Sequence, residues 1–115
     1  PKVHWVNYSG LPSHADYPLV QKYMRGNASG ILNFGVKGGR AGGARFQDAL
    51  QMILRLVNIG DTKTLATHPA STTHRQLSAQ ELEKAGVSED MIRLSIGIEH
   101  IDDIIADLDQ ALAAA

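Results

Sequence analysis

Hydrophobic and polar residues alternate over residues 30–37 and 91–97, and this alternation predicts two β-strands. Each strand would have one apolar face and one mixed face. The apolar faces consist of Leu32, Phe34 and Val36 in the first strand, and of Ile92, Leu94 and Ile96 in the second. The mixed faces carry Asn33 in the first strand, and Arg93 and Ser95 in the second. Residues 55–59, which include Leu56, Val57 and Ile59, predict a further strand, which ends at Gly60-Asp61.

Apolar residues spaced three and four apart predict helices over about 44–52 and 100–114. Two shorter helices are expected: one from Ser13 or Asp16 to Met24, and one that follows a capping box at residues 78–81 and ends at Gly86. Pro18 favours the later start of the first, because proline is tolerated in a first turn. The first dozen residues are rich in turn formers and are expected to form a loop.

These elements predict an α+β two-layer domain, with a short, mostly antiparallel sheet and helices on one face. A parallel sheet covered on both sides would need continuous apolar runs, which these strands lack. The length of 115 residues suits one domain over residues 1–115. The uncovered sheet face, with Asn33, Arg93 and Ser95, must then meet water or another domain.

Composition narrows the classes of function. Eleven basic and twelve acidic residues give a net charge of −1, so the excess positive charge that nucleic-acid binding needs is missing. We expect no membrane partner, because no apolar run approaches the roughly 20 residues of a membrane span. The absence of cysteine agrees with a reducing, cytoplasmic location. The chain begins at Pro1 without an initiator methionine, so we expect a processed chain or a fragment of a longer one.

Three features could carry chemistry. Arg93, on the mixed face of a predicted strand, could bind a carboxylate through two parallel hydrogen bonds, although its position alone favours a solvated arginine or an interdomain ion pair. The glycines of residues 35–43 lie between a strand and a helix, but their spacing fits no nucleotide-binding pattern and favours a flexible connection. Residues 68–74 are rich in hydroxyls and imidazoles; their spacing fits no zinc site, and we expect a hydroxyl-lined loop and no metal.

Several stretches together resemble the cystathionine gamma-synthase family of pyridoxal-phosphate enzymes. The matching stretches are residues 7–11, 30–39, 58–61, 65–74 and 91–104, so the resemblance covers essentially the whole chain. It implies the C-terminal, substrate-binding domain of a larger enzyme. Within the family, Asn58, the pair Thr72-Thr73 and residues 36–39 look most like O-acetylhomoserine sulfhydrylases. That activity exchanges the acetoxy group of O-acetyl-L-homoserine for sulfide and gives homocysteine and acetate, a step of methionine biosynthesis.

The same resemblance implies a homotetramer and an amino acid substrate. It places the family's carboxylate-binding arginine at Arg93, a residue supporting the same carboxylate at Asn58, and a pocket-lining residue at Thr73. His74 would be structural. Pyridoxal 5'-phosphate would be bound by an upstream domain that this chain lacks, together with the N-terminal arm.

None of the five lysines matches the setting of the family's cofactor-binding lysine. We therefore expect no catalytic or cofactor-binding residue in this chain, and no activity of the chain alone. Two alternatives remain open at this point. One is cystathionine gamma-synthase or methionine gamma-lyase activity within the same family. The other is a non-catalytic α+β module for binding or oligomerisation.

Overall fold

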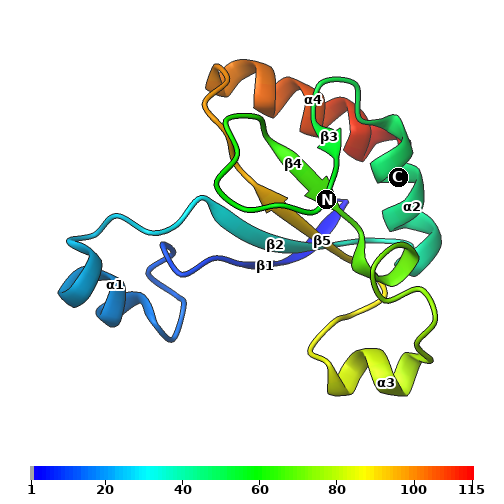
Figure 1. Ribbon diagram of the computed structural model, residues 1–115, viewed down its shortest axis with the longest axis horizontal. Coiled ribbons are helices and arrows are strands. Elements are labelled where there is room, and N and C mark those ends of the chain that lie inside the picture. The colour runs from blue at the N-terminus through cyan, green and yellow to red at the C-terminus, as the bar shows by residue number, and fades with distance from the viewer. Residues whose placement is uncertain (1) are drawn as a thin grey trace.

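The computed structural model describes residues 2–115, which form a five-stranded mixed sheet with helices packed against it (Figure 1). The strand order is β1-β2-β5-β4-β3, and all neighbouring pairs are antiparallel except β3 with β4. The strands are β1 (Val3–Asn7), β2 (Ile31–Val36), β3 (Leu54–Arg55), β4 (Leu65–Thr67) and β5 (Met91–Ser95). The α-helices are α1 (Tyr17–Met24), α2 (Gly39–Ala49), α3 (Ala79–Lys84) and α4 (Ile101–Ala114). The predicted α+β class is confirmed.

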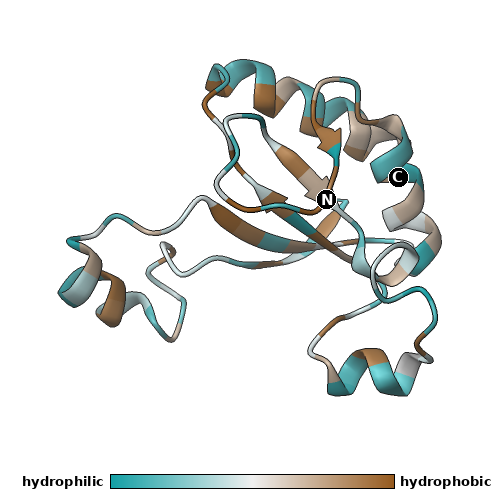
Figure 2. Ribbon diagram, in the orientation of Figure 1, coloured by the Kyte–Doolittle hydropathy of each residue, from teal (hydrophilic) through white to brown (hydrophobic). Residues whose placement is uncertain are grey.

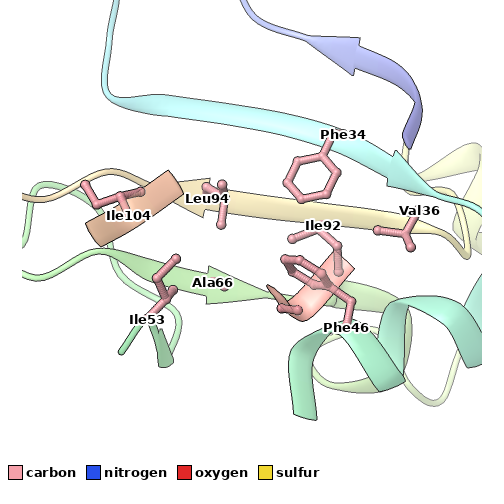
Figure 3. Packing of buried hydrophobic residues seen from close by; sticks show 9 residues of the cluster. Phe34, Val36, Phe46, Ile53, Ala66, Ile92, Leu94 and Ile104 are labelled. Carbon is pink, nitrogen blue, oxygen red and sulfur yellow. The ribbon is translucent and has the colours of Figure 1, made fainter. Parts of the chain in front are cut away.

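The two longest helices, α2 and α4, cover the apolar face of the sheet. The predicted inward residues of β2 and β5 meet Phe46 from α2 and Ile104 from α4 in one core (Figure 3). Phe34 and Phe46 pack edge to face with ring centroids 5.6 Å apart. A second, smaller core joins α3 to the opposite side of β5 through Leu82 and Met91. The capping box that begins α3 is present as predicted, between Ser78 and Glu81.

Three strand predictions were wrong or incomplete. Residues 3–7 form the edge strand β1, although turn formers surround them. The predicted strand over 55–59 shortens to β3, and its remaining apolar side chains, such as Ile59 at 65% exposure, project outward. Residues 65–67 form the buried strand β4, which is too short to show a period in the sequence. Its partners β5 and β3 lie elsewhere along the chain, so its burial depends on tertiary contacts.

Helix α2 begins at Gly39, five residues before the predicted start at 44, so Gly39, Gly42 and Gly43, which were predicted to end the strand, lie within the helix. Close packing requires glycine at Gly42 and Gly43. A β-carbon on Gly42 would overlap the carbonyl oxygen of Lys37, and one on Gly43 would lie 2.5 Å from Nε2 of His68. The glycine cluster therefore lets α2 approach β2 and the buried His68.

This packing predicts that Gly43→Ala destabilises the protein, against the usual rule for helices. Glycine to alanine inside a helix normally gains up to about 1 kcal/mol. Here the added methyl group would press on His68, which is fully buried, and overpacking of this kind costs about 1–3 kcal/mol. Urea unfolding should show a net loss, whereas Ala41→Ser, on the exposed side of the same helix, should change little. A stabilised Gly43→Ala protein would contradict this account of the contact.

Two regions extend the apolar surface beyond the core. The connection between β1 and β2 projects from the sheet and carries α1, with Leu19 and Tyr23 exposed (Figure 1). Asp16 precedes α1, as the later of the two predicted starts requires.

Beside α4, an open groove of about 360 Å3 is lined only by apolar residues of β1, β2, β5, the segment after β5 and α4. Figure 2 shows the corresponding hydrophobic colouring on the sheet and on α4. Within residues 2–115, no helix is long and apolar enough to cross a membrane.

Candidate functional site

A row of polar residues crosses the face of the sheet opposite α2 and α4. The strand register pairs Asn7 with Asn33, Asn33 with Arg93, and Arg93 with Thr67, on β1, β2, β5 and β4 in turn. Side chains at paired positions of antiparallel strands lie on the same face, with β-carbons about 4.5–5.5 Å apart. Arg93 is therefore flanked by an amide on one side and a hydroxyl on the other. This places it on the mixed face, as predicted.

The Arg93 guanidinium contacts the predicted supporting residue directly. Its Nη2 donates a long hydrogen bond of 3.4 Å to the backbone carbonyl of Asn58. The side chain of Asn58 turns back on its own loop, where Oδ1 accepts from the amide of Ile59 at 2.9 Å. The structure thus brings together Arg93 and Asn58, through the backbone of Asn58.

No carboxylate among residues 2–115 forms an ion pair with Arg93. The ion pairs in this part of the chain are formed by other basic residues, namely His4, Arg40, Arg55 and His100. Its immediate neighbours in the row, Asn33 and Thr67, are uncharged, and Arg93 is only partly buried. A guanidinium has five N–H donors in a planar fork that matches a carboxylate. The site can therefore accept an external carboxylate.

The loop from Asn58 to Thr64 is fixed over this part of the sheet by hydrogen bonds to β5 and the segment after it. The amide of Gly60 donates to Oγ of Ser95 at 3.4 Å. The amide and hydroxyl of Thr64 both donate to the Glu99 carboxylate, each at 2.7 Å. These hydrogen bonds, led by that of the Thr64 hydroxyl, hold the pKa of Glu99 below its ordinary value. The loop that presents the Asn58 carbonyl is thus tied down at its far end.

The structure places Thr73, the third predicted site residue, in an exposed turn. Its hydroxyl lies 2.8 Å from Nδ1 of the neighbouring His74, and no hydrogen bond joins it to the polar row within the described residues. Thr72 is the hydroxyl that reaches the row, because its Oγ1 lies 3.2 Å from Oγ1 of Thr67. Thr72 also donates to the carbonyl of His68 at 2.8 Å.

His68 is a residue that sequence reasoning did not single out. Its ring is fully buried, with Nε2 2.8 Å from the carbonyl of Glu89 and Nδ1 2.8 Å from Oγ of Ser71. A carbonyl can only accept, so Nε2 donates and Nδ1 accepts from the serine hydroxyl. His68 thereby ties the turn after Thr67 to the segment before β5. Nothing in the local sequence pattern distinguishes this histidine from the exposed ones.

An open hollow of about 540 Å3 lies next to the row, on the same face. Its lining includes Trp5, Asn7, Asn33 and Met91. The Trp5 indole donates to Oδ2 of Asp90 at 2.9 Å and lies where a β-carbon on Gly35 would be. Burial raises the pKa of Asp90, but hydrogen bonds from Ser88 and Trp5 outweigh it and hold that pKa below its ordinary value. Asp90 is thus an ionised acceptor that fixes one wall of the hollow.

The chain's residues do not fit pyridoxal phosphate as a covalently held group. All five lysines are exposed, namely Lys2, Lys22, Lys37, Lys63 and Lys84. None of them lines the hollow that adjoins Asn7 and Asn33 of the polar row. In the part of the chain that the structure describes, no three His, Asp or Glu side chains are grouped so that they could hold a metal ion.

Comparisons with known proteins identify the family of this chain. The family model of Cys/Met metabolism PLP-dependent enzymes matches residues 1–113. O-acetyl-L-homoserine sulfhydrylase 1 of Thermus thermophilus is 53% identical over 113 residues, which cover 98% of this chain and 27% of that protein. L-methionine gamma-lyase of Pseudomonas deceptionensis is 45% identical over 114 residues, which cover 99% of this chain and 28% of that protein.

A solved structure shares the fold. It is that of a candidate O-acetylhomoserine (thiol)-lyase from Campylobacter jejuni, which contains a pyridoxyl-lysine monophosphate. The TM-score is 0.87 at 48% identity, over 98% of this chain and 27% of that one. The chain therefore spans only about 27% of the length of these relatives. With a family model that matches nearly every residue, the chain belongs to the pyridoxal-phosphate-dependent enzymes of Cys/Met metabolism.

Proposed function

We propose that this chain is the C-terminal, substrate-binding part of an O-acetyl-L-homoserine sulfhydrylase. In this proposal Arg93 binds the carboxylate of the amino acid substrate, with the Asn58 carbonyl orienting the guanidinium. The observation that carries the proposal is the position of Arg93: on the open sheet face, held by one backbone carbonyl, and without a carboxylate partner among residues 2–115. The name of the Thermus thermophilus relative supports the choice of reaction.

The contribution of this chain to the reaction is binding and orientation. A carboxylate held by two parallel hydrogen bonds has a fixed direction, so the rest of the substrate is aimed at one place. Pyridoxal phosphate, held by the remainder of the longer polypeptide, would supply an electron sink for carbanion chemistry. Thr73 would line the substrate pocket, next to Thr72, whose hydroxyl lies 3.2 Å from that of Thr67. The proposal includes a homotetramer in the cytoplasm, which the sequence resemblance supports.

A product assay tests the reaction. Full-length protein that carries this chain should convert O-acetyl-L-homoserine and sulfide into homocysteine and acetate. Cysteine in place of sulfide should give little cystathionine, and methionine alone should give little methanethiol. A protein that forms cystathionine or methanethiol faster than homocysteine, at equal substrate concentrations, would refute the sulfhydrylase assignment. The carboxylate role of Arg93 would survive that result, because all three substrates are amino acids.

The 45% identity to an L-methionine gamma-lyase favours gamma-lyase activity as the second candidate. A gamma-lyase would release the sulfur group from methionine and would need no thiol as a second substrate. The assay with methionine alone therefore separates the two candidates, since a sulfhydrylase requires an added sulfur nucleophile for its main product.

A further inference from the structure

The side chain of Asn33 contains a buried acceptor that is not used within residues 2–115. Its Oδ1 is shielded from solvent and has no hydrogen-bond partner there. Buried polar groups are nearly always paired, and leaving one unpaired is unfavourable. An unpaired acceptor of this kind, on the open face of the sheet, suggests that a hydrogen-bond donor reaches it when a ligand is bound.

The register places Asn33 directly opposite Arg93, on the same open face. Asn33 also lines the hollow of about 540 Å3 that adjoins the row. On the other side of Asn33 lies Asn7, whose Oδ1 is 2.8 Å from Nε2 of His14 and whose amide offers two N–H donors. Arg93 offers five N–H donors, of which one is directed to the Asn58 carbonyl, so it has the larger number of N–H groups available to Asn33.

An amide oxygen suits this position chemically. Two N–H groups of a guanidinium pair with a carboxylate, and one already points to the Asn58 carbonyl, so further N–H groups need acceptors. An uncharged acceptor can fix the orientation of the guanidinium plane without competing with the substrate carboxylate for the positive charge. A carboxylate at the same place would form an ion pair with Arg93 and exclude the substrate.

We propose that Asn33 is a positioning residue for the carboxylate site: when a substrate carboxylate is bound, Oδ1 of Asn33 accepts an N–H of Arg93. The guanidinium is then held between the Asn33 oxygen on β2 and the Asn58 carbonyl on the loop after β3. This inference rests on the proposed role of Arg93 and adds a second residue to the same site.

The test compares Asn33→Leu and Asn33→Asp with Asn27→Leu in the full-length protein. Asn33→Leu keeps the size and removes the acceptor; the KM for O-acetyl-L-homoserine should rise about tenfold while kcat changes less than about twofold. Asn33→Asp should raise the KM more, because its charge competes with the substrate for Arg93. Asn27→Leu makes the same exchange in an exposed loop and should leave both constants unchanged. An unchanged KM in Asn33→Leu would overturn the inference.

Binding of L-norvaline, which has the carboxylate but no leaving group, gives a readout without turnover. By calorimetry, Asn33→Leu should weaken its binding in the wild-type background and have no further effect in the Arg93→Lys background, because both changes act on one interaction. Additive losses would indicate an effect independent of Arg93 and would overturn the inference. If Arg93→Lys leaves the binding of L-norvaline unchanged, the proposed function is refuted. If Arg93→Lys weakens the binding and Asn33→Leu leaves it unchanged, only the role of Asn33 is refuted.

Discussion

Replacing Arg93 by lysine in the full-length protein is expected to raise the KM for the amino acid substrate between about 30-fold and several thousandfold. The estimate follows from the loss of a charge-assisted pair, which costs about 2–5 kcal/mol. Lysine keeps the charge, but its compact ammonium cannot present two parallel donors to a carboxylate and another donor to the Asn58 carbonyl. Steady-state kinetics with varied O-acetyl-L-homoserine and saturating sulfide would measure the change.

A matched control is Arg45→Lys, the same exchange at an exposed position of α2. It should leave KM and kcat unchanged. The melting temperature of Arg93→Lys should stay close to that of the wild type, because Arg93 makes only one long hydrogen bond within the described residues. A normal KM in a folded Arg93→Lys protein would exclude the carboxylate role.

The second large effect is expected on stability, at Asp107 of α4. Its carboxylate accepts three consecutive backbone amides after α2: Gln51 at 2.9 Å on Oδ1, and Met52 and Ile53 at 3.0 and 2.8 Å on Oδ2. Asp107→Asn would place an NH2 group against one set of these donors, whichever way the amide is turned. Hydrogen bonds to charged groups contribute about 1.5–3 kcal/mol each, so we expect a loss of about 3 kcal/mol or more by urea unfolding.

The effect of Asp107→Asn should depend on pH in a defined direction. Burial raises the pKa of Asp107, but the amides of Ile53, Gln51 and Met52 and the side chain of Gln110 outweigh it and lower the pKa. A lowered folded pKa stabilises the protein above the unfolded pKa of about 3.9, and this stabilisation is lost as the pH falls through the folded value. The difference between wild type and variant should therefore be constant near neutral pH and shrink below about pH 4.

Asp109→Asn is the control for both measurements, because Asp109 is exposed two residues further along the same helix. It should change stability by less than about 0.5 kcal/mol. A difference between Asp107→Asn and wild type that stays constant into acid would show that the carboxylate charge plays no part in holding the segment after α2.

The elements predicted most accurately from the sequence are those with a long, regular period. β2, β5 and α4 alternate or repeat over five residues or more, and the apolar positions of β2 and β5 form the core as expected. In α4, Ile104, Leu108 and Leu112 pack in the core, whereas Ile101 and Ile105 are exposed. β4 could not be predicted in this way, because three buried residues show no period and its place beside β5 depends on distant parts of the chain. The predicted start of α2 was wrong, because glycines that are required for close packing cannot be distinguished in the sequence from glycines that interrupt an element.

Some features of the candidate site could likewise be predicted from the sequence, and others could not. The alternation around Arg93 predicted its place on the open face, and the family resemblance suggested the role that we propose for it and linked it to Asn58. The contact through the Asn58 backbone, the hydrogen bond of Thr72 to Thr67, and the orphan oxygen of Asn33 depend on three-dimensional neighbours. His68 and Asp107 are similar, because each forms a hydrogen bond with the backbone of a segment 21 or more residues away.

The most direct test of the central claim compares two ligands that differ only in the carboxylate. L-norvaline and n-butylamine share the amine and the side chain, and their dissociation constants can be measured by calorimetry on full-length protein. If Arg93 holds the carboxylate, the wild-type protein will prefer L-norvaline by at least about tenfold, and Arg93→Lys will lose most of that preference. An equal preference in the two proteins would contradict the account.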